Sequence, residues 1–457
     1  MRSSSIGLLT AFALIAGLQS GCSTFSPQPI DQVPFRDRVE TQERDGLTVS
    51  VTVLSQKESK EIFGIDIYDE GIQPIWARIE NDTDVPYWFM LHGVDPNYFS
   101  AREAAYKSHF MLRGWSNRKM DDHFESLGIV PAVPPRGSTT GFVFSHVKLG
   151  TKEIRIQLLA ENTVERFHFY VSVPGFRADH DAVDWRSVAR DTDIIELDTD
   201  EELLEMVEQL PCCTTRKNGT GDGDPLNLVI IAPAHALLAF VRAGWDETEV
   251  LSLSSGWKTF KAFFGGEYKY SPMSALYYNR QPQHVGLQKA RDTIHERNHL
   301  RLWITPWRYK GDFVLVGTIT RDIGVYFTTR AWNLTTHAID PMVDEARTYL
   351  VEDLITAESV KTFGTAGGIG AATKEHPHYN LMMAPFWTDG RRAIIRLVKR
   401  EDRVPIDEIG YFSFHKPGQA ITKFKGMQLE GGTLHEPDAA GSETDGTNAE
   451  PDADDTP

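Results

Sequence analysis

The sequence predicts a multidomain protein in which an N-terminal β-sandwich of the immunoglobulin-like kind is followed by an α+β domain. Positions 47–176 hold short segments of alternating apolar and polar residues separated by turn residues, as in a sandwich of antiparallel strands. Positions 200–428 mix buried-strand and amphipathic-helix patterns instead. The chain has 457 residues, which is enough for two or three domains, and its 41% hydrophobic content is sufficient for packed cores.

The first residues have the pattern of a signal peptide. Arg2 supplies a positive charge, and the apolar run Ile6–Leu18 is shorter than the about 20 residues that a membrane-spanning helix needs. Small residues then precede Cys22, in an order that resembles the lipobox of bacterial lipoproteins. Gln19 stands where that pattern usually has leucine, and an ordinary secreted protein cut nearby is the alternative.

The lipobox resemblance implies an address for the whole protein. Residues 1–21 would be removed, Cys22 would carry lipid such as palmitate, and the polar segment 22–46 would be a tether to the membrane. Ser23, directly after the cysteine, implies an outer-membrane lipoprotein that faces the periplasm. No second apolar run approaches membrane length.

The predicted sandwich begins where strict alternation begins. In Leu47–Val53 the apolar residues occupy every second position, which is the period of a half-buried strand. Ser100 and Glu103 have the spacing of a capping box, so the insert at about 100–126 is predicted to be helical. The other predicted strands are Ile72–Ile79, Gly141–Ser145, Ile154–Leu159 and Phe167–Val173.

A charged linker over 177–199 leads to the second domain, which opens with the amphipathic helix Asp200–Leu210. The elements that follow resemble a split β-α-β arrangement with additions. Lys310-Gly311 is predicted to form a tight turn, and Asp340 to cap a helix that Pro341 begins. The remaining predicted elements are the strands 226–231, 300–306, 313–320, 359–363 and 391–398 and the helix 234–243.

The net charge of −17 is concentrated at the C-terminus. Nine acidic residues and no basic residue follow Lys425, and almost no large apolar side chain accompanies them. We therefore expect an acidic disordered tail over 429–457. No basic stripe predicts a nucleic-acid partner.

The remaining cysteines, Cys212 and Cys213, are neighbours in the sequence. A disulfide between adjacent residues is strained, so the sequence predicts no disulfide framework. These thiols also have no obvious base partner that would make them nucleophiles.

Several blocks of the second domain resemble the LssY C-terminal domain family. They occur in order over about Leu203–Arg400. In relatives this domain often follows membrane-embedded segments of the phosphatase or DedA type. The resemblance implies membrane association and no established reaction. The blocks are LPCCTTRKNGTGDGDPLNLVIIA, FVRAGWDET, LQKARDTIHERNHLRLW, RDIGV, TTHAIDPMVDEARTYLVEDL and TDGRRA.

The string His295-Glu296-Arg297-Asn298-His299 has the His-Glu-x-x-His spacing. On a helix, two histidines four residues apart share a face and can bind one zinc ion, with Glu296 beside it as the base. His337 is the first candidate for the third ligand, ahead of Asp322, Asp340 and Glu345. The residues after the string alternate as in a strand, which would place the histidines on a turn instead.

The same stretch is also a candidate anion site. Arg291, Arg297 and Arg301, with His299, carry donors that suit a phosphate or a carboxylate. The alternative is a structural network in which these arginines pair with Glu296, Asp322 and Asp344.

Three functional hypotheses follow from the sequence. The first is a noncatalytic envelope lipoprotein whose C-terminal domain binds a protein partner or an anionic ligand. The second is a metal-dependent hydrolase that uses His295, Glu296 and His299. The third is a lipid-phosphate enzyme, which rests only on analogy with relatives.

Overall fold

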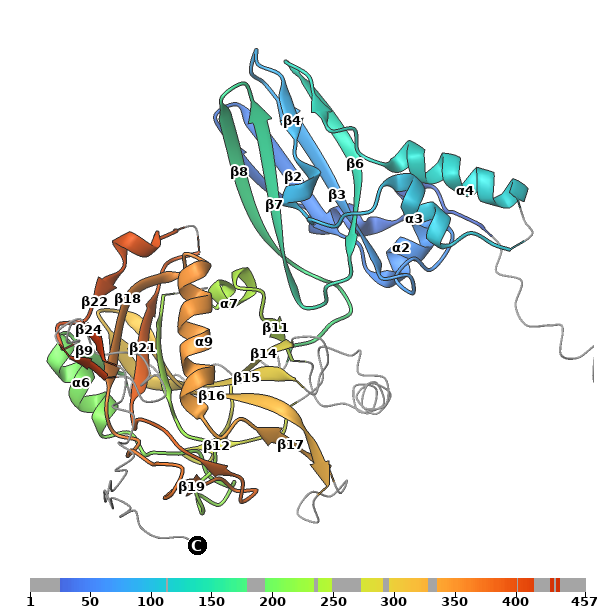
Figure 1. Cartoon of the computed structure of the whole chain (residues 1–457). Helices are drawn as coiled ribbons and strands as arrows, with labels where there is room; N and C mark the ends of the chain where they lie inside the picture. The colour runs from blue at the N-terminus through green and yellow to red at the C-terminus, as the bar shows by residue number, and fades with distance from the viewer. Residues whose placement is uncertain are drawn as a thin grey trace, which may run out of the picture.

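The structure is a computed structural model of the chain. It describes residues 25–111, 114–178, 194–233, 237–248, 273–290, 296–327, 335–400, 402–414, 428–430 and 433–435. Cys22 and most of the acidic tail therefore lie outside the described residues. The described part is rich in β-sheet and forms two domains (Figure 1).

The N-terminal domain contains two four-stranded antiparallel sheets. Their strands run in the orders β1-β2-β3-β6 and β5-β4-β7-β8. The bounds are β1 (Glu40–Arg44), β2 (Leu47–Val53), β3 (Ile72–Asn81), β4 (Tyr87–Phe89), β5 (Ala132–Val133), β6 (Gly137–His146), β7 (Thr151–Ala160) and β8 (Thr163–Ser172). The five predicted strands of this domain are thereby confirmed as β2, β3, β6, β7 and β8.

The core of this domain lies between the two sheets, because alternate residues of each strand point inward. Val49 and Val51 of β2 pack in one cluster with Ile156 of β7 and Phe169 of β8. All four side chains are almost completely buried, and each contributes about 1.5–3 kcal/mol of hydrophobic stabilisation.

The predicted tether is wrong over its second half. Val33 and Phe35 are buried in a second core cluster, and β1 pairs with β2 over its whole length. The alternation of β1 is weak because most of its side chains are polar and its outer edge is unpaired in the sheet order, so the sequence pattern did not indicate a strand. Two short 3-10 helices, η1 (Ile30–Gln32) and η2 (Pro34–Arg38), precede it.

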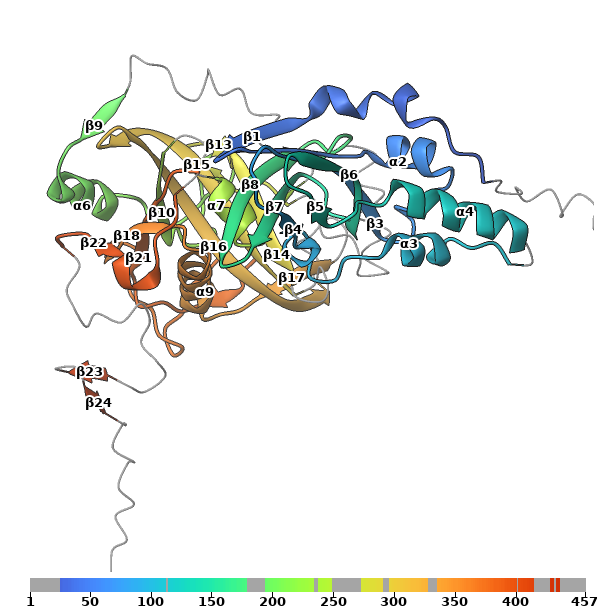
Figure 2. The ribbon, with the colours of Figure 1, turned by 90° about the horizontal axis from the view of Figure 1, so that it is seen from above.

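Three α-helices pack beside the sheets (Figure 2). They are α2 (Gln56–Phe63), α3 (Ala101–Lys107) and α4 (Gly114–Leu127), with the 3-10 turn η3 (Leu91–Gly93) before α3. The predicted capping box is confirmed at α3, where the Ser100 side chain accepts from the Glu103 amide and the Glu103 side chain accepts from the Ser100 amide. The helical insert is therefore a pair of helices.

The second domain is built on one large mixed sheet with the strand order β11-β14-β15-β16-β10-β21-β18-β22. β17 pairs with β16, and β9 pairs with β15. The bounds are β9 (Ile195–Leu197), β10 (Leu228–Ala232), β11 (Asp246–Glu247), β14 (Val285–Ala290), β15 (Arg297–Tyr309), β16 (Asp312–Phe327), β17 (Thr335–Ile339), β18 (Val360–Ala366), β21 (Arg392–Leu397) and β22 (Gly410–Tyr411). The predicted succession of strands and helices in this domain is confirmed.

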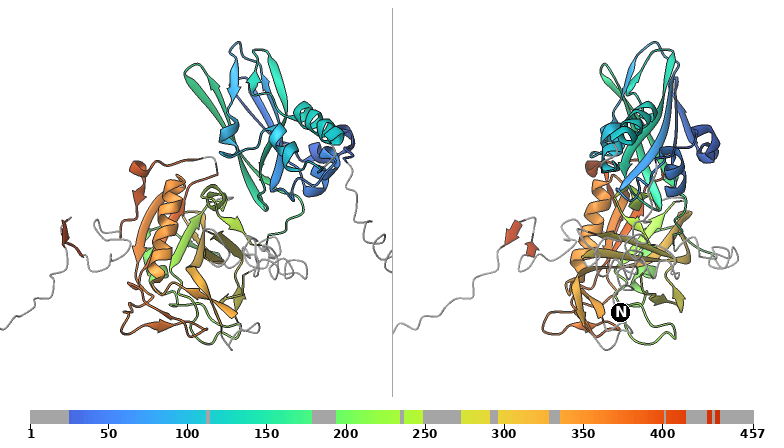
Figure 3. Two further views of the ribbon diagram at one scale, coloured as in Figure 1. Left: turned by 45° about the vertical axis from the view of Figure 1, so that its right-hand side comes forward. Right: turned by 90° about the vertical axis from the view of Figure 1, so that its right-hand side faces the viewer.

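Helices cover both faces of this sheet (Figures 1 and 3). α7 (Leu238–Arg242) and α9 (Val343–Thr356) pack on one face with Leu300 and Leu302 of β15. α6 (Asp200–Glu208) packs on the other face with Trp303. Smaller elements complete the domain: β12 (Tyr277–Tyr278), β13 (Gln281–Pro282), β19 (His378–Tyr379), β20 (Pro385–Phe386) and the 3-10 turn η6 (Ile406–Glu408).

Local turn chemistry explains where several elements begin and end. Lys310 and Gly311 both have positive φ, as a two-residue hairpin turn requires, and this confirms the predicted turn. The helix α9 begins at Val343 rather than at Pro341, because the Asp340 side chain accepts from the Met342 amide and forms a turn before the helix. The predicted linker ends in β9, which pairs with Trp307–Tyr309 of β15.

The segment predicted to be disordered from 429 onwards contains a short hairpin. β23 (Gln428–Glu430) pairs with β24 (Thr433–His435). The structure differs from the prediction at these residues. The sequence between the two strands is Gly431-Gly432, a dipeptide that favours a two-residue hairpin connection. Positions 436–457, which hold most of the acids, lie outside the described residues.

The two domains meet where β7 of the first faces α7 and β11 of the second (Figure 1). The Glu247 carboxylate accepts from the Thr151 amide at 2.6 Å, and Lys148 lies 3.6 Å from Asp246. Arg242 donates to the hydroxyl of Tyr170 at 3.2 Å. Among the described residues, no helix is long and apolar enough to span a membrane.

Candidate functional site

The candidate site lies on one face of β15, where alternation separates two kinds of side chain. Leu300 and Leu302 point to the apolar core beneath α9. Arg297, His299 and Arg301 occupy the alternate positions and therefore share the opposite face. All three basic side chains are less than 8% exposed. We call this face of the sheet, with the groups that contact it, the basic face.

Neighbouring strands extend the basic face with polar groups. The strand register places Gln288 of β14 and Thr320 of β16 on either side of His299. Thr318 lies beside Arg301 in the same way. These three side chains are also buried, so the middle of the sheet has an apolar face and a polar face. Burying polar groups costs free energy unless they form hydrogen bonds. A buried sheet face made of polar side chains therefore needs hydrogen-bond partners for them.

Two carboxylates from different parts of the chain lie against the basic side chains. The Asp322 Oδ2 atom is 3.7 Å from Arg297 Nε and 3.5 Å from His299 Nδ1. Asp224 Oδ2 lies 3.9 Å from Arg301 Nη1. Arg297 also donates to the side-chain oxygen of Gln288 at 2.6 Å.

Asp224 reaches the basic face because its loop is held from two sides. The Thr214 amide donates to the Asp224 carbonyl at 2.9 Å. The Asn380 side chain, from a loop far along the sequence, donates to Asp224 Oδ1 at 3.1 Å. Gly223 permits the close approach of the two sides of this loop, since a Cβ there would lie 2.4 Å from the Thr214 hydroxyl.

Burial shifts the charge balance of the basic face. Desolvation raises the pKa of Asp322 from 3.8 to about 7, even though Arg297 and Arg301 act to lower it. Desolvation also lowers the pKa of Arg297 to about 10, so this guanidinium stays charged at neutral pH. Two guanidinium charges therefore face the Asp224 carboxylate and an Asp322 carboxyl that is only partly ionised at neutral pH. A cluster with such shifted pKa values is a candidate functional site.

The structure brings together only part of the predicted metal site. His299 is the third residue of strand β15, and Glu296 is an exposed residue in a bend just before it. The His-Glu-x-x-His string needs a helix, and the prediction of a helix is wrong at His299. This residue lies in a strand that pairs with β14 and β16. His295 lies outside the described residues.

The other proposed ligands are dispersed or outside the described side chains. The backbone of His337 pairs with Val325 in β17, and its side chain lies outside the description. Asp340 accepts from the Met342 amide, and Glu345 lies in the first turn of α9. Among the described side chains, no three His, Cys, Asp or Glu residues gather to hold a metal ion. The zinc site thus stays a prediction that depends on His295.

The predicted anion site is partly assembled. Arg297 and Arg301 lie four residues apart on the same strand face, with His299 between them, and Arg291 lies outside the described residues. Of the ion pairs predicted for a structural network, the contact of Arg297 with Asp322 is present. Asp344 belongs to a different cluster, in which it accepts from the Thr388 hydroxyl and the Asp389 amide.

That second cluster is structural. The fully buried guanidinium of Arg347 in α9 donates to both carboxylate oxygens of Asp389 at 2.8–2.9 Å. It also donates to the Arg391 carbonyl. The two-pronged geometry fixes α9 against the turn before β21. We assign these residues to the fold because their short contacts leave the charges closely paired.

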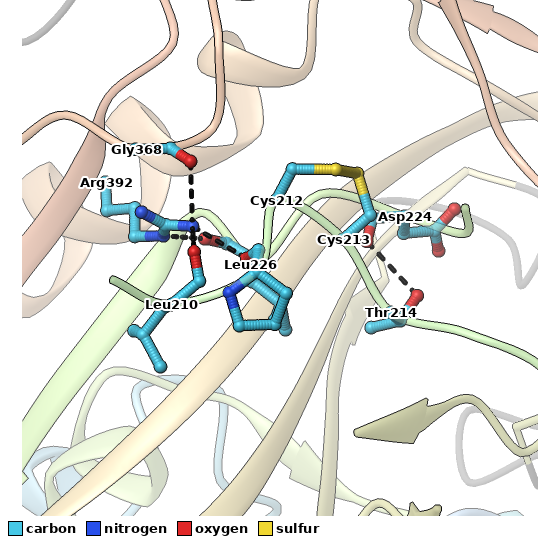
Figure 4. Close-up of a disulfide and its surroundings, with 9 residues drawn as sticks. Leu210, Cys212, Cys213, Thr214, Asp224, Leu226, Gly368 and Arg392 are labelled. Atoms are coloured by element: carbon cyan, nitrogen blue, oxygen red, sulfur yellow. Dashed lines mark hydrogen bonds between the residues drawn. A yellow bond between two sulfur atoms is a disulfide. The ribbon is translucent and has the colours of Figure 1, made fainter. Parts of the chain in front are cut away.

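Arg392 is a further buried arginine with a structural role (Figure 4). Its guanidinium donates only to backbone carbonyls in the described structure, and burial lowers its pKa to about 10. These carbonyls belong to the last turn of α6, to the segment between α6 and β10, and to the loop after β18. Arg392 thereby places a positive charge at the negative end of the α6 dipole. The carbonyls belong to Val207, Leu210, Pro211, Leu226, Gly367 and Gly368.

Cys212 and Cys213 form a disulfide with each other (Figure 4). The expectation of two thiols is therefore wrong, and the pair contributes a local ring rather than a framework. Cys212 follows the carbonyls that Arg392 binds, and its own carbonyl accepts from the Leu226 amide. The disulfide thus lies at the base of the loop that carries Asp224.

The comparison with known families identifies this domain. Residues 204–391 match the family model described as LssY C-terminus. The second domain of the chain belongs to this family. No curated protein matches the chain. The LssY C-terminal domain therefore contains both β15 with its basic face and the structural cluster of Arg347 and Asp389.

A cavity of about 440 Å³ lies between the LssY C-terminal domain and the first domain. Charges of both signs line it, including Glu153 and Arg155 on β7 and Arg403 in the second domain. Arg403 donates to the carbonyls of Arg400 and Asp402. These contacts give the arginine a structural role, so the basic face of β15 remains the stronger candidate.

Proposed function

We propose that the chain is a lipid-anchored envelope protein whose LssY C-terminal domain binds a small anionic ligand at the basic face. The observation that carries the proposal is the buried set Arg297, His299 and Arg301 on one face of one strand. Arginine presents a planar fork of donors that matches phosphate, sulfate and carboxylate groups. A sheet face inside a domain provides the low dielectric in which such contacts are strong.

The charges gathered at this face support an anionic ligand. The nearest carboxylate oxygens lie 3.7 Å from Arg297 Nε and 3.9 Å from Arg301 Nη1. Arg297 and Arg301 are four residues apart, so their Cα atoms lie about 13 Å apart with His299 between them. The proposed anion therefore lies above His299, where the long side chains of both arginines can reach it.

The proposal also covers the place of the protein in the cell. Cys22 would be acylated, and the two four-stranded sheets would form an immunoglobulin-like sandwich that spaces the binding domain from the membrane. The lipobox order before Cys22 and the shared core of the two sheets support this assignment. The anchor side would face the periplasm, with the outer membrane favoured by Ser23.

The test is calorimetric titration of the full chain with sulfate and with inorganic phosphate. We expect Arg301→Gln to weaken binding by about 10- to 150-fold, the equivalent of losing one hydrogen-bonded charge of about 1.5–3 kcal/mol. Arg396→Gln is the matched control, since Arg396 is an arginine of the same sheet that pairs with Asp312 instead. Equal binding by wild type and Arg301→Gln, with both correctly folded, would refute the proposal.

A further inference from the structure

The helical insert of the first domain ends in a group of exposed aromatic and apolar side chains. Tyr106 is 71% exposed, Met111 is 89% exposed and Trp115 is 67% exposed. We call these residues, together with the exposed basic residues Lys107, Arg118 and Lys119, the insert tip. They lie at the junction of α3 and α4, far from the contact with the second domain (Figure 2).

The buried faces of the insert are formed by other side chains. Ala104, Ala105, Met120 and Phe124 supply the buried faces of α3 and α4. The Asn117 side chain of α4 donates to the carbonyl of Phe110, beyond the end of α3, and accepts from its amide. Tyr106, Met111 and Trp115 stay largely exposed and belong to none of the buried core clusters, so together they indicate an interaction surface.

The composition of the tip suits the surface of a lipid bilayer. Tryptophan and tyrosine concentrate at the level of lipid headgroups, where an apolar ring and a polar edge are both accommodated. The Lys119 ammonium lies 3.8 Å from the centre of the Trp115 ring. Long basic side chains beside apolar ones can bury their stems and keep their charges near anionic headgroups.

The position of the N-terminal segment indicates that the insert tip contacts the bilayer. Phe25 packs edge-on against His123 of α4, with their ring centres 5.8 Å apart. Only three peptide units separate Phe25 from Cys22, so their Cα atoms lie within about 11 Å of each other. Along α4, Trp115 is about 12 Å from His123. A lipid on Cys22 would therefore hold the insert tip within reach of the headgroups.

We propose that the insert tip lies in the headgroup region of the membrane that anchors the protein, with Met111 and Trp115 as its apolar contacts. The inference rests on the proposed lipid anchor at Cys22. The acyl chains supply the attachment, and the tip then sets the orientation of the first domain. The LssY C-terminal domain, on the opposite end of the first domain, would project away from the bilayer (Figure 3).

The experiment uses the full, lipidated chain in vesicles of phosphatidylethanolamine and phosphatidylglycerol. A fluorophore is attached at Met111→Cys, and the vesicles contain lipids with a nitroxide quencher on the headgroup. Cys212 and Cys213 are joined in a disulfide and do not take the label without reduction. The matched control is Ile406→Cys, because Ile406 is a 74% exposed apolar residue of the second domain.

We expect quenching of the probe at position 111 and none at position 406 in vesicles recovered by flotation. Adding Trp115→Ser to the Met111→Cys chain should reduce the quenching, because the tip loses its main aromatic contact. A floated protein whose position 111 is quenched no more than position 406 overturns the inference and leaves the anchor standing. A chain that does not float at all overturns the anchor, and the inference with it.

Discussion

Replacing Asp322 with asparagine should stabilise the folded protein above neutral pH and change its stability little near pH 4. The Asp322 side chain is buried, and burial raises its pKa from 3.8 to about 7. In the unfolded chain the same group ionises near its ordinary value of about 4. The folded state therefore holds an extra proton between about pH 4 and pH 7, and stability falls as the pH rises through this window. Asparagine mimics the protonated carboxyl and removes this loss.

The size of the effect follows from the difference between the two pKa values. A rise from 3.8 to about 7 corresponds to roughly 4 kcal/mol, at about 1.4 kcal/mol for each pKa unit. This is a ceiling on the gain at pH 8, and it already includes the attraction of Arg297 and Arg301, which act to lower the pKa. We therefore expect a gain that is positive and smaller than about 4 kcal/mol.

Urea unfolding of wild type and Asp322→Asn at about pH 4 and about pH 8 measures this difference, because the other acidic groups are common to both chains. Asp312→Asn is the matched control. Asp312 pairs with Arg396 at 2.5 Å in the same sheet, so its replacement should cost stability instead. An Asp322→Asn protein that is less stable than wild type at pH 8 would show that the ionised carboxylate stabilises the basic face, and would refute the reasoning.

Three further predictions concern the anchor, the fold and the metal hypothesis. Cys22→Ala should release the mature chain from membranes or block its processing, as fractionation after a salt wash will show. Arg392→Met should lower the free energy of unfolding by about 3–5 kcal/mol, because buried carbonyls lose their donor. Arg396→Met should lower it by about 1 kcal/mol or less. Urea unfolding measures both variants. His299→Ala should have the same zinc content as wild type in elemental analysis, since His299 lies in strand β15 and not on a helix. If wild type contains stoichiometric zinc and the variant loses it, the hydrolase hypothesis is supported again.

Sequence patterns predicted the fold best where a single period dominates a segment. Leu47–Val53 alternates without a break and forms β2 with the same bounds. The Ser100–Glu103 capping box and the Lys310-Gly311 turn are local signals, and both are confirmed by the structure. The pairing between distant strands could not be predicted from local patterns. β10 lies between β16 and β21, and this order depends on contacts between segments far apart in the sequence.

The candidate site shows why a motif needs its structural context. The spacing of His295 and His299 suits a helix, whereas the alternation over Leu300–Trp303, directly after the string, suits a strand. Pairing with β14 and β16 decides between them, since buried strand residues gain hydrogen bonds on both sides. The same pairing places Arg297 and Arg301 on one face of the strand. The strand geometry therefore favours the anion hypothesis over the metal hypothesis.

The structural arginine and the site belong to one loop system. Arg392 binds the carbonyls of Leu210 and Pro211, and the Cys212 carbonyl accepts from the Leu226 amide. Because these contacts fix both ends of the loop, its tip can hold Asp224 beside Arg301. Loosening the base of the loop should move this carboxylate and change the charge at the basic face, without any substitution at the face itself. The Cys212–Cys213 disulfide lies at that base, so sulfate affinity measured before and after its reduction would show whether the loop and the basic face are coupled.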